Sequence, residues 1–303
     1  MKKPRIVITG ASGFIGTNLV KKLLKNGYKN IVAIDKNKFS DNSVKTAIGN
    51  FNDSALLNKV IRKNDIVIHL ACSTVPALSE SDKEKDIKEN VFGTLKLLKI
   101  STNKKINKFI FFSSGGTVYG DKNYPVSEEA ETSPINSHGS MKLMIENDIK
   151  IFNRQHGLNY VIIRPSNPYG REKSNKKNQG VIDIFLKKII NNETLEIWGD
   201  GKIIRDYIYI DDLTDLVAKT IESAVSNEIL NAGSGQGTSI NDIIKIIGKI
   251  TNKKIKVKYL SARNFDTPYN VLDVRKAKTI LNWEPSTKLG DGIRKIYDKL
   301  KNV

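Results

Sequence analysis

The residues with the clearest chemical use lie near the start of the chain, where three glycines recur within Thr9–Gly16 (TGASGFIG). This stretch follows an apolar run, Ile6–Ile8, and precedes a segment with apolar residues at helical spacing. A strand, a glycine turn and a helix in this order form a dinucleotide site. Gly10 permits the tight turn, Gly13 lets backbone N–H groups approach a diphosphate, and Gly16 lets the helix pack against the strand. The helix N-terminus then faces the phosphates with the positive end of its dipole.

An acidic residue farther along indicates which dinucleotide binds. The apolar run 31–34 reads as the second strand and ends in Asp35. It lies about twenty residues after the glycines, where a carboxylate can accept a hydrogen bond from the adenosine ribose 2′-hydroxyl. The same carboxylate would repel a 2′-phosphate, although Lys36 and Lys38 reduce that repulsion. We therefore expect NAD rather than NADP.

The elements that must position this loop follow from the alternation of apolar runs and helical periods in the first half of the chain. Further buried strands are expected at 65–71, 109–112 and 160–163, and helices at 54–62, 87–101 and 141–152. That rhythm predicts an α/β fold, a Rossmann-type doubly wound parallel sheet with right-handed crossovers.

The rhythm changes after Arg164-Pro165, and residues 170–180 are polar and basic and read as a loop. We expect an NAD-binding Rossmann domain over 1–168, with segments near 204–232 returning to it. A smaller C-terminal lobe over 169–303 is expected to bind mainly the substrate. Ligands of such sheets bind at the carboxyl ends of the strands, so the site is expected between the lobes.

The chain of 303 residues has a formal charge of +18. Its lysines are spread along the whole chain, and many fall on what should be solvated helix faces. Nucleic-acid binding would need them clustered on one face with interleaved aromatic residues, so this class of function is disfavoured. A loose attraction to anionic membrane surfaces and attraction of a diphosphate substrate both remain open.

The single cysteine, Cys72, excludes an internal disulfide and fits a reducing compartment. No apolar run approaches the length needed to span a bilayer, and no signal peptide precedes the first strand. We expect a soluble, cytoplasmic protein without stable membrane insertion.

Taken together, the motifs resemble those of the extended short-chain dehydrogenases/reductases that act on nucleotide sugars, such as UDP-glucose 4-epimerases. The resemblance runs from Ile6 nearly to the C-terminus. Asn50 stands where the family usually has an aspartate. The motifs after the glycine loop are GNFND (49–53), HLAC (69–72), NVFGT (90–94), SSGGTVYG (113–120), RPSNPYG (164–170), RDYIYIDD (205–212) and RNFD (263–266).

The resemblance implies a set of cofactor-binding residues and no metal. These residues are Gly10, Ser12, Gly13, Phe14, Ile15, Gly16, Asp35, Lys36, Asn50, Phe51, Leu70, Ala71, Cys72, Asn90, Ser113, Lys142 and Pro165.

The family's chemistry is a reversible hydride transfer served by a Tyr-x-x-x-Lys pair one helical turn apart. The lysine binds the nicotinamide ribose and lowers the pKa of the phenol. The phenolate takes the proton of a sugar hydroxyl while hydride leaves the same carbon. Here the motif reads His138 to Lys142 (HGSMK), so the lysine is present and histidine replaces the tyrosine.

Two interpretations of His138 compete. Imidazole has an ordinary pKa of about 6.5 and could act as a general base. It is shorter than tyrosine, however, and Lys142 would lower its pKa. The site is therefore either a histidine-based variant or one that is weakened or lost, naturally or by engineering. The presence of Lys142 and of the cofactor and substrate motifs favours retained sugar-nucleotide chemistry.

The hydroxyl residue that normally bonds the reacting oxygen falls on Gly115. Thr117, two residues on and on the same face of an extended strand, is the best substitute, and Ser114 is the second choice. The family's dehydratases carry an Asp-Glu pair where this chain has Gly116 and Thr117. Dehydration is therefore disfavoured, and epimerisation is expected.

Substrate recognition is expected from Arg205 and Arg263, because two guanidinium groups suit a diphosphate. Trp198 is expected to flank the base or to pack in the core. Asn270 falls at the family's gatekeeper near the sugar C2 substituent, and its size should admit an N-acetyl group. The resemblance adds Thr74, Asn167, Val181 and Asp266 to the substrate-binding residues. We expect His69, His156 and Tyr119 to be structural.

The expected function is NAD-dependent epimerisation of a nucleotide sugar at C4 through a 4-keto intermediate. The substrate is expected to be a UDP-hexose or UDP-N-acetylhexosamine, or another NDP-sugar, for surface polysaccharide synthesis. A nucleotide-sugar reductase, decarboxylase or dehydratase, and a catalytically weakened sugar-nucleotide-binding homologue, remain alternatives. The resemblance also implies a homodimer formed by helices 87–101 and 141–152. The apolar residues noted for that interface are Leu95, Leu98, Leu143, Ile145 and Ile149.

Overall fold

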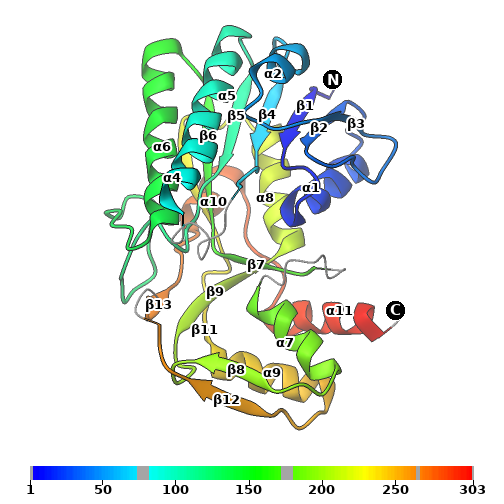
Figure 1. The fold of residues 1–303 in the computed structure, drawn as a ribbon, viewed down its shortest axis with the longest axis vertical. Helices are drawn as coiled ribbons and strands as arrows, with labels where there is room; N and C mark the ends of the chain where they lie inside the picture. The colour runs from blue at the N-terminus through cyan, green and yellow to red at the C-terminus, as the bar shows by residue number, and fades with distance from the viewer. Residues whose placement is uncertain (1–2, 74–81, 172–179, 264–266, 302–303) are drawn as a thin grey trace.

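The computed structural model describes residues 3–73, 82–171, 180–263 and 267–301 of the chain. Its larger part is a seven-stranded sheet with helices on both faces (Figure 1). Every neighbouring pair in this sheet is parallel, which confirms the predicted fold class. In sheet order the strands are β10 (Glu228–Ala232), β6 (Tyr160–Pro165), β5 (Lys108–Phe112), β4 (Ile66–His69), β1 (Ile6–Thr9), β2 (Ile31–Asp35) and β3 (Lys45–Ile48).

Successive side chains of a strand point to opposite faces of the sheet, so the strands contribute residues to two separate cores. Ile6 and Ile8 of β1 belong to the core shared with α1 (Phe14–Lys25), α8 (Ile210–Glu222) and α10 (Arg275–Leu281). Val7 belongs to the core on the opposite face. The helices over that second face are α2 (Ser54–Val60), α5 (Phe92–Asn103) and α6 (Ser137–His156).

One helix on the second face contains a local irregularity. The short α4 (Lys83–Asp86) runs into α5 through a π-helical turn, Ile87–Val91. Such turns insert one extra residue into a helix and are frequent at functional sites. The observed helix therefore starts earlier than the predicted 87–101 and changes its hydrogen bonding within that range.

The smaller part of the molecule begins where the chain leaves the last residues of β6 in the large sheet. The chain leaves β6 and forms β7 (Asn167–Tyr169) directly, and β7 pairs in parallel with β9 (Ile204–Tyr209). Two further strands pair with β9, and a separate two-stranded ribbon lies beyond them. These strands are β11 (Gly237–Ser239), β13 (Tyr269–Asn270), β8 (Leu195–Trp198) and β12 (Val257–Leu260). The helices of this part are α7 (Val181–Ile190), α9 (Ile240–Thr251) and α11 (Leu289–Lys301).

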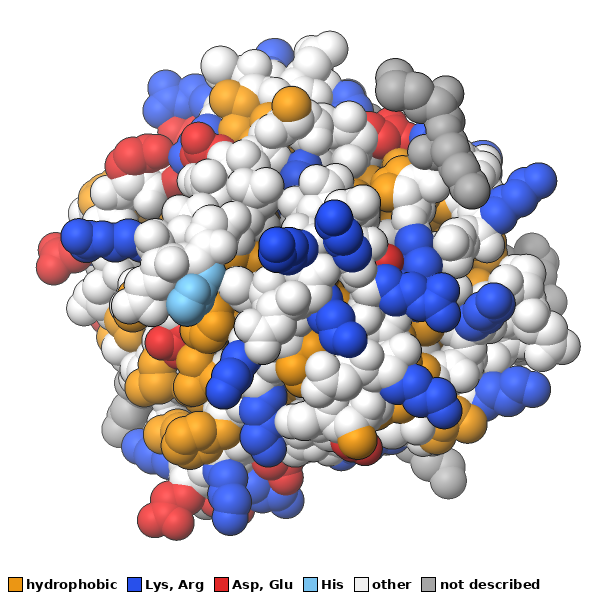
Figure 2. Space-filling view, turned by 90° about the horizontal axis from the view of Figure 1, so that it is seen from above, with side chains coloured by type: hydrophobic (Ala, Val, Ile, Leu, Met, Phe, Trp, Pro, Cys, Tyr) orange, Lys and Arg blue, Asp and Glu red, His pale blue; other side chains and the backbone are white. Residues whose placement is uncertain are grey.

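The excess of Lys and Arg over Asp and Glu in the sequence is visible on the surface. Figure 2 shows Lys and Arg side chains projecting from much of the upper face, with few Asp and Glu side chains among them. No helix among the described residues combines the length and apolar character needed to cross a membrane.

Three of the apolar residues noted for a dimer interface lie elsewhere. Leu98, Ile145 and Ile149 are at most 2% exposed, because they point into the core between α5, α6 and the sheet. The apolar side chains that these helices leave exposed are different ones, among them Phe92 and Met144. Helical periodicity alone did not separate the face towards the sheet from the face towards solvent.

A buried ion pair ties α6 to β6. Arg164 donates from Nη2 to Glu146 Oε2 at 2.6 Å and from Nε to Oε1 at 2.9 Å, and both side chains are at most 2% exposed. Ser113 donates to the same carboxylate. Arg164 also donates to the Tyr119 hydroxyl at 2.9 Å, which in turn donates to Asn231 Oδ1 at 2.7 Å. The cluster thus joins β5, β6, α6 and β10, and Tyr119 has the structural role expected of it.

Glu146→Ala should lower the free energy of unfolding by about 3–5 kcal/mol, because it leaves the buried Arg164 charge without its partner. Equilibrium urea unfolding measures this difference. Lys245→Ala is the matched control, since its ion pair with Asp242 is exposed and should contribute less than about 1 kcal/mol. A Glu146→Ala loss no larger than that of the control would contradict the account.

Candidate functional site

The glycine loop between β1 and α1 is shaped by close backbone contacts. Gly10 has a φ of +73°, and a Cβ on it would lie 2.7 Å from the backbone nitrogen of Ala71. A Cβ on Gly16 would lie 2.5 Å from the carbonyl oxygen of Gly10. Both positions therefore exclude every larger residue. The loop and the first turn of α1 can pack this closely only with glycine.

The same loop leaves an anion site at the start of α1. Gly13 is the N-cap and provides no side-chain cap, and the first turn contains no acidic residue. The first backbone N–H groups of a helix need partners from outside it, and a diphosphate satisfies them while meeting the positive end of the helix dipole. The residues present therefore fit the diphosphate of a dinucleotide.

Asp35 closes this site on the side of β2. Its Oδ2 accepts a hydrogen bond from the backbone N–H of Ser12 at 3.0 Å, and its Oδ1 accepts from Asn37 at 3.2 Å. The carboxylate is thereby held against the glycine loop. Lys36, the next residue, is exposed.

The residues expected on the adenine and nicotinamide sides differ in burial and in hydrogen bonding. The Phe51 ring is buried, 5.1 Å from the His69 ring, so its side chain is part of the core. Asn50 accepts from the backbone of Asn52 at 3.3 Å. Asn90, in the π-helical turn, donates to Asp86 and accepts from the backbone of Ser73 at 2.9 Å.

His69 is a structural residue, as expected. Its two ring nitrogens face the hydroxyls of Thr9, at 2.6 Å, and Thr94, at 2.9 Å. Burial, with a smaller contribution from Lys142, lowers the pKa of its imidazole to about 3. His69 therefore braces β4 as a neutral ring.

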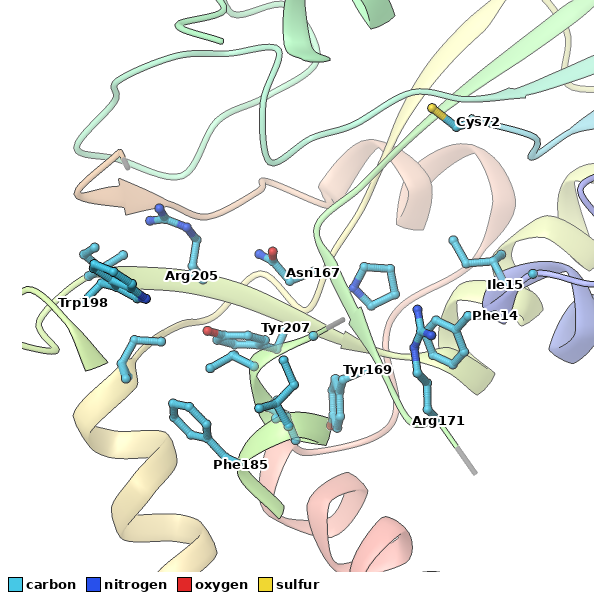
Figure 3. A pocket seen from close by; sticks show the side chains of 18 of the residues that line it. Phe14, Ile15, Cys72, Asn167, Tyr169, Arg171, Phe185, Trp198, Arg205 and Tyr207 are labelled. Atoms are coloured by element: carbon cyan, nitrogen blue, oxygen red, sulfur yellow. The ribbon is translucent and has the colours of Figure 1, made fainter. Parts of the chain in front are cut away.

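One cavity of about 940 Å³ joins the glycine loop to the smaller lobe (Figure 3). This volume lies in the upper part of the range for ligand pockets. The structure brings many of the expected residues together in its wall, namely Gly10, Gly13, Phe14, Ile15, Gly16, Leu70, Cys72, Asn167, Val181, Trp198, Arg205 and Arg263. Expected cofactor and substrate residues thus share one partly open cavity, whereas the expected catalytic residues His138, Lys142, Thr117 and Ser114 are not among its lining residues.

The expected substrate residues sit at the far end of this cavity. Arg263 lies over the Trp198 ring, with its Cζ 5.7 Å from the ring centroid. The Trp198 side chain is 49% exposed, so it is not a core residue. Arg205 is directed into the space beside Trp198 (Figure 3). Asn167 also lines the cavity and donates to the carbonyl of Asp206 at 2.9 Å.

Two expected substrate residues, Thr74 and Asp266, lie outside the described residues. Within the described residues, no group of three His, Cys, Asp or Glu side chains could hold a metal ion.

His138 and Lys142 face the sheet from the first turns of α6. The helix begins here because Asn136 accepts a hydrogen bond from the backbone N–H of Gly139 at 2.9 Å, as an N-cap does. Lys142 donates to the carbonyl of Phe112 at 2.9 Å, and its ammonium lies 4.9 Å from the centroid of the Phe111 ring. Phe112 is itself a cavity residue, so Lys142 stands directly behind the wall.

The His138 imidazole is neutral. Burial and, to a smaller extent, Lys142 lower its pKa, Asp86 partly opposes them, and the result is a pKa of about 4. Its Nδ1 is buried and has no hydrogen-bond partner among the described residues. Because buried polar atoms are nearly always paired, an unpaired one marks a place for a ligand or water.

Further unpaired polar atoms belong to Thr117, which packs against the start of α6, and to Asn270, which bonds the nearby Gly115. Within the described residues, the hydroxyl of Thr117 is buried without a hydrogen-bond partner, as is Asn270 Oδ1. Thr117 lies against the start of α6, where a Cβ on Gly139 would clash with its carbonyl. Asn270 donates from Nδ2 to the carbonyl of Gly115 at 3.1 Å. His138, Thr117 and Asn270 therefore each have one buried polar atom without a hydrogen-bond partner among the described residues.

A residue with a hydroxyl side chain at position 115 would require the Leu272 side chain to move. A Cβ there would lie 2.6 Å from Leu272 Cδ1 and 3.0 Å from the carbonyl oxygen of Arg164. Of the two substitutes expected, Thr117 has the buried and unpartnered hydroxyl. The hydroxyl of Ser113, an expected cofactor residue, is engaged by Glu146.

Sequence reasoning missed Asp86 and Arg171. Asp86 is buried and close enough to raise the pKa of His138. Arg171 lines the cavity beside Phe14. The only sequence signals were a carboxylate one turn before the NVFGT motif and an arginine directly after RPSNPYG.

The fold and the dinucleotide site define a class that sequence comparison confirms. Residues 6–233 match the family described as the NAD dependent epimerase/dehydratase family. The match covers most of the chain, which therefore belongs to this family, and its cofactor is NAD.

Individual relatives of the chain cover more than one activity. A protein of Methanocaldococcus jannaschii, named provisionally as a UDP-glucose 4-epimerase, is 34% identical over 98% of both chains. The dTDP-4-dehydro-6-deoxyglucose reductase of Escherichia coli is 32% identical over 99% of this chain and 98% of its own. Among solved structures, the UDP-glucose 4-epimerase of Thermotoga maritima with UDP-glucose superposes with a TM-score of 0.93 at 32% identity, covering 98% of this chain and 99% of that one.

The His138 imidazole should stay neutral down to about pH 5 in the folded protein, since its pKa lies near 4 instead of 6.5. Between these pH values the unfolded chain binds more protons, so acidification from about 6.5 to about 4 should lower the free energy of unfolding. NMR titration of the ring resonances measures the pKa directly. Lys142→Met should raise it by removing a neighbouring positive charge. Titration of His138 near 6.5 in the unmodified protein would show that the ring is not buried as described.

Proposed function

We propose that this protein epimerises the C4 hydroxyl of a UDP-sugar, a hexose or an N-acetylhexosamine, using NAD. One observation carries the proposal. A single cavity runs from the N-terminus of α1, which has no side-chain cap, to Arg205 and Arg263, and Lys142 donates to the carbonyl of Phe112 in its wall. One helical turn before Lys142, His138 Nδ1 is buried without a hydrogen-bond partner among the described residues, as is the Thr117 hydroxyl. A binding protein for one nucleotide needs no such combination. The Thermotoga maritima relative solved with UDP-glucose supports the choice of UDP.

NAD, when bound, accepts a hydride and returns it. In the proposed mechanism, His138 Nδ1 accepts the proton of the sugar C4 hydroxyl and later gives it back. The Thr117 hydroxyl donates a hydrogen bond to the same oxygen. Lys142 binds the nicotinamide ribose, and its charge disfavours the protonated imidazole, which promotes return of the proton.

The arginine end of the cavity orients the substrate. Arg205 and Arg263 would bind its diphosphate with charge-assisted hydrogen bonds, and Trp198 would pack against the base. Epimerisation also requires that the sugar turns over between the two hydride transfers.

A sugar-nucleotide-binding protein with weak or no turnover is the second candidate. The observation that favours it is the pKa of His138, near 4. A general base works best when its pKa lies near the operating pH, and this imidazole is a weaker base than an ordinary histidine. The two candidates share the binding site and differ only in proton transfer.

We propose further that the protein is a homodimer and supplies a cytoplasmic pathway of surface polysaccharide synthesis. The face formed by the π-helical turn, α5 and α6 supports the dimer. It exposes Ile87, Phe92, Met144 and Ile151 by 40–56% each, and a row of exposed apolar side chains on paired helices is typical of an interface. None of the four side chains packs in the core, whereas Leu98, Ile145 and Ile149 do.

Light scattering at micromolar concentration should therefore give twice the mass of the chain. Replacing Phe92 and Met144 with glutamate should produce monomers, because the paired charges would have to be buried without partners. The matched control replaces Tyr124, exposed by 51% outside these helices, and should leave the mass unchanged. A monomer before any substitution would contradict the dimer.

Incubation with UDP-galactose or UDP-N-acetylgalactosamine should form the C4 epimer, resolved by NMR. Conversion of the N-acetylated sugar would support the expectation that Asn270 leaves room at C2. Lys142→Ala should lower turnover at least about tenfold, while UDP affinity changes little, because its proposed partner is the cofactor ribose and not UDP. Weakened UDP binding with normal turnover of bound substrate would contradict this role.

His138→Tyr distinguishes the two candidate functions. If His138 is an adapted base, the tyrosine variant should be slower at neutral pH by about tenfold or more. If the site is weakened, the variant should be faster, since it restores the family's usual phenol. The pH dependence of kcat is the measurement, with His156→Tyr at the far end of α6 as the control. Identical rates and profiles would show that this residue does not transfer the proton.

A further inference from the structure

Arg171 connects the two parts of the molecule at the cofactor end of the cavity. It follows β7 after one intervening residue, Gly170, and its guanidinium Cζ lies 4.7 Å from the centroid of the Phe14 ring. Phe14 is the first residue of α1, immediately after the N-cap Gly13. Figure 3 shows the two side chains stacked at one side of the cavity. The cation therefore stands beside the helix terminus at which a diphosphate would bind.

The backbone of Arg171 is anchored from the smaller lobe. Its N–H donates to Asp183 Oδ1, 3.3 Å away in the first turn of α7. Burial lowers the pKa of Arg171, and the Asp183 carboxylate opposes that effect. An arginine remains charged in proteins at any physiological pH, so a full positive charge is fixed in the cavity wall.

The cavity thus holds cations at two separate ends. Arg171 and Phe14 lie at one end and Arg205 and Trp198 at the other (Figure 3). A helix N-terminus offers only partial charges, about half an elementary charge in total, whereas a dinucleotide diphosphate carries two negative charges. The stacked guanidinium supplies the missing charge in a planar form that can donate two parallel hydrogen bonds.

We propose that Arg171 binds the diphosphate of NAD and holds the cofactor between the lobes. Arg171 would contact the diphosphate from the smaller lobe, and the glycine loop would contact it from the large domain. The role concerns binding and does not depend on which reaction the protein catalyses.

The test replaces Arg171 with methionine, which keeps an unbranched apolar stem over Phe14 and removes the charge. NAD content after purification and affinities for NAD, ADP-ribose and UDP by titration calorimetry are the readouts. Arg171→Met should lose bound NAD and weaken NAD and ADP-ribose binding about tenfold or more, with UDP affinity within about twofold. Arg171→Lys should recover part of the loss. Raising the salt concentration should weaken NAD binding less in Arg171→Met than in the unmodified protein.

Lys188→Met is the matched control, because Lys188 is another cation in the cavity wall and lies on α7. It should retain NAD. Unchanged NAD affinity in Arg171→Met would overturn the proposal. So would a selective loss of UDP affinity, which would assign Arg171 to the substrate. A lower unfolding temperature without ligand, with all three affinities reduced equally, would overturn it as well by showing a purely structural role.

Discussion

The buried ion pair between Arg164 and Glu146 is the constraint on which the site depends. Glu146 sits one turn after Lys142 on α6, and Arg164 immediately precedes Pro165, where the chain leaves the large sheet for the smaller lobe. The pair therefore fixes the helix that carries His138 and Lys142 relative to the strand that leads to the substrate residues. A buried pair of this kind contributes little net stability, and its value here lies in relative position.

Much of the fold could be predicted from the sequence because the large sheet is parallel and buried on both faces. Continuous apolar runs such as Ile6–Ile8 and the helical periods between them leave few alternatives. The glycine loop was predictable for a different reason, since Gly10 and Gly16 are required by backbone contacts that no other residue permits.

Other features depend on contacts between distant segments, which local patterns do not contain. Periodicity marked Leu98 and Ile149 as apolar but not which way they face. Leu272, far along the chain, occupies the space that a Cβ at position 115 would need. The influence of Asp86 on His138 and the stacking of Arg171 on Phe14 likewise join residues far apart in the chain.

The electrostatic surroundings of His138 affect hydrogen bonding and proton transfer in opposite ways. Burial and Lys142 keep the His138 ring neutral, which preserves its ability to accept a hydrogen bond but makes it a weak base. A bound sugar and cofactor would exclude water further, and the unpaired Thr117 hydroxyl and His138 Nδ1 would then gain partners. Turnover under this account depends on how far substrate binding offsets the low basicity of the free protein.

The most direct test of the account follows a UDP-sugar that carries deuterium at C4. In the proposed reaction the C4 hydrogen leaves and returns as hydride, which does not exchange with water, so both epimers should retain deuterium at C4 in ordinary water. Mass spectrometry and NMR of the product mixture measure this retention. Loss of the label to solvent, or the absence of any C4 epimer, would contradict the account.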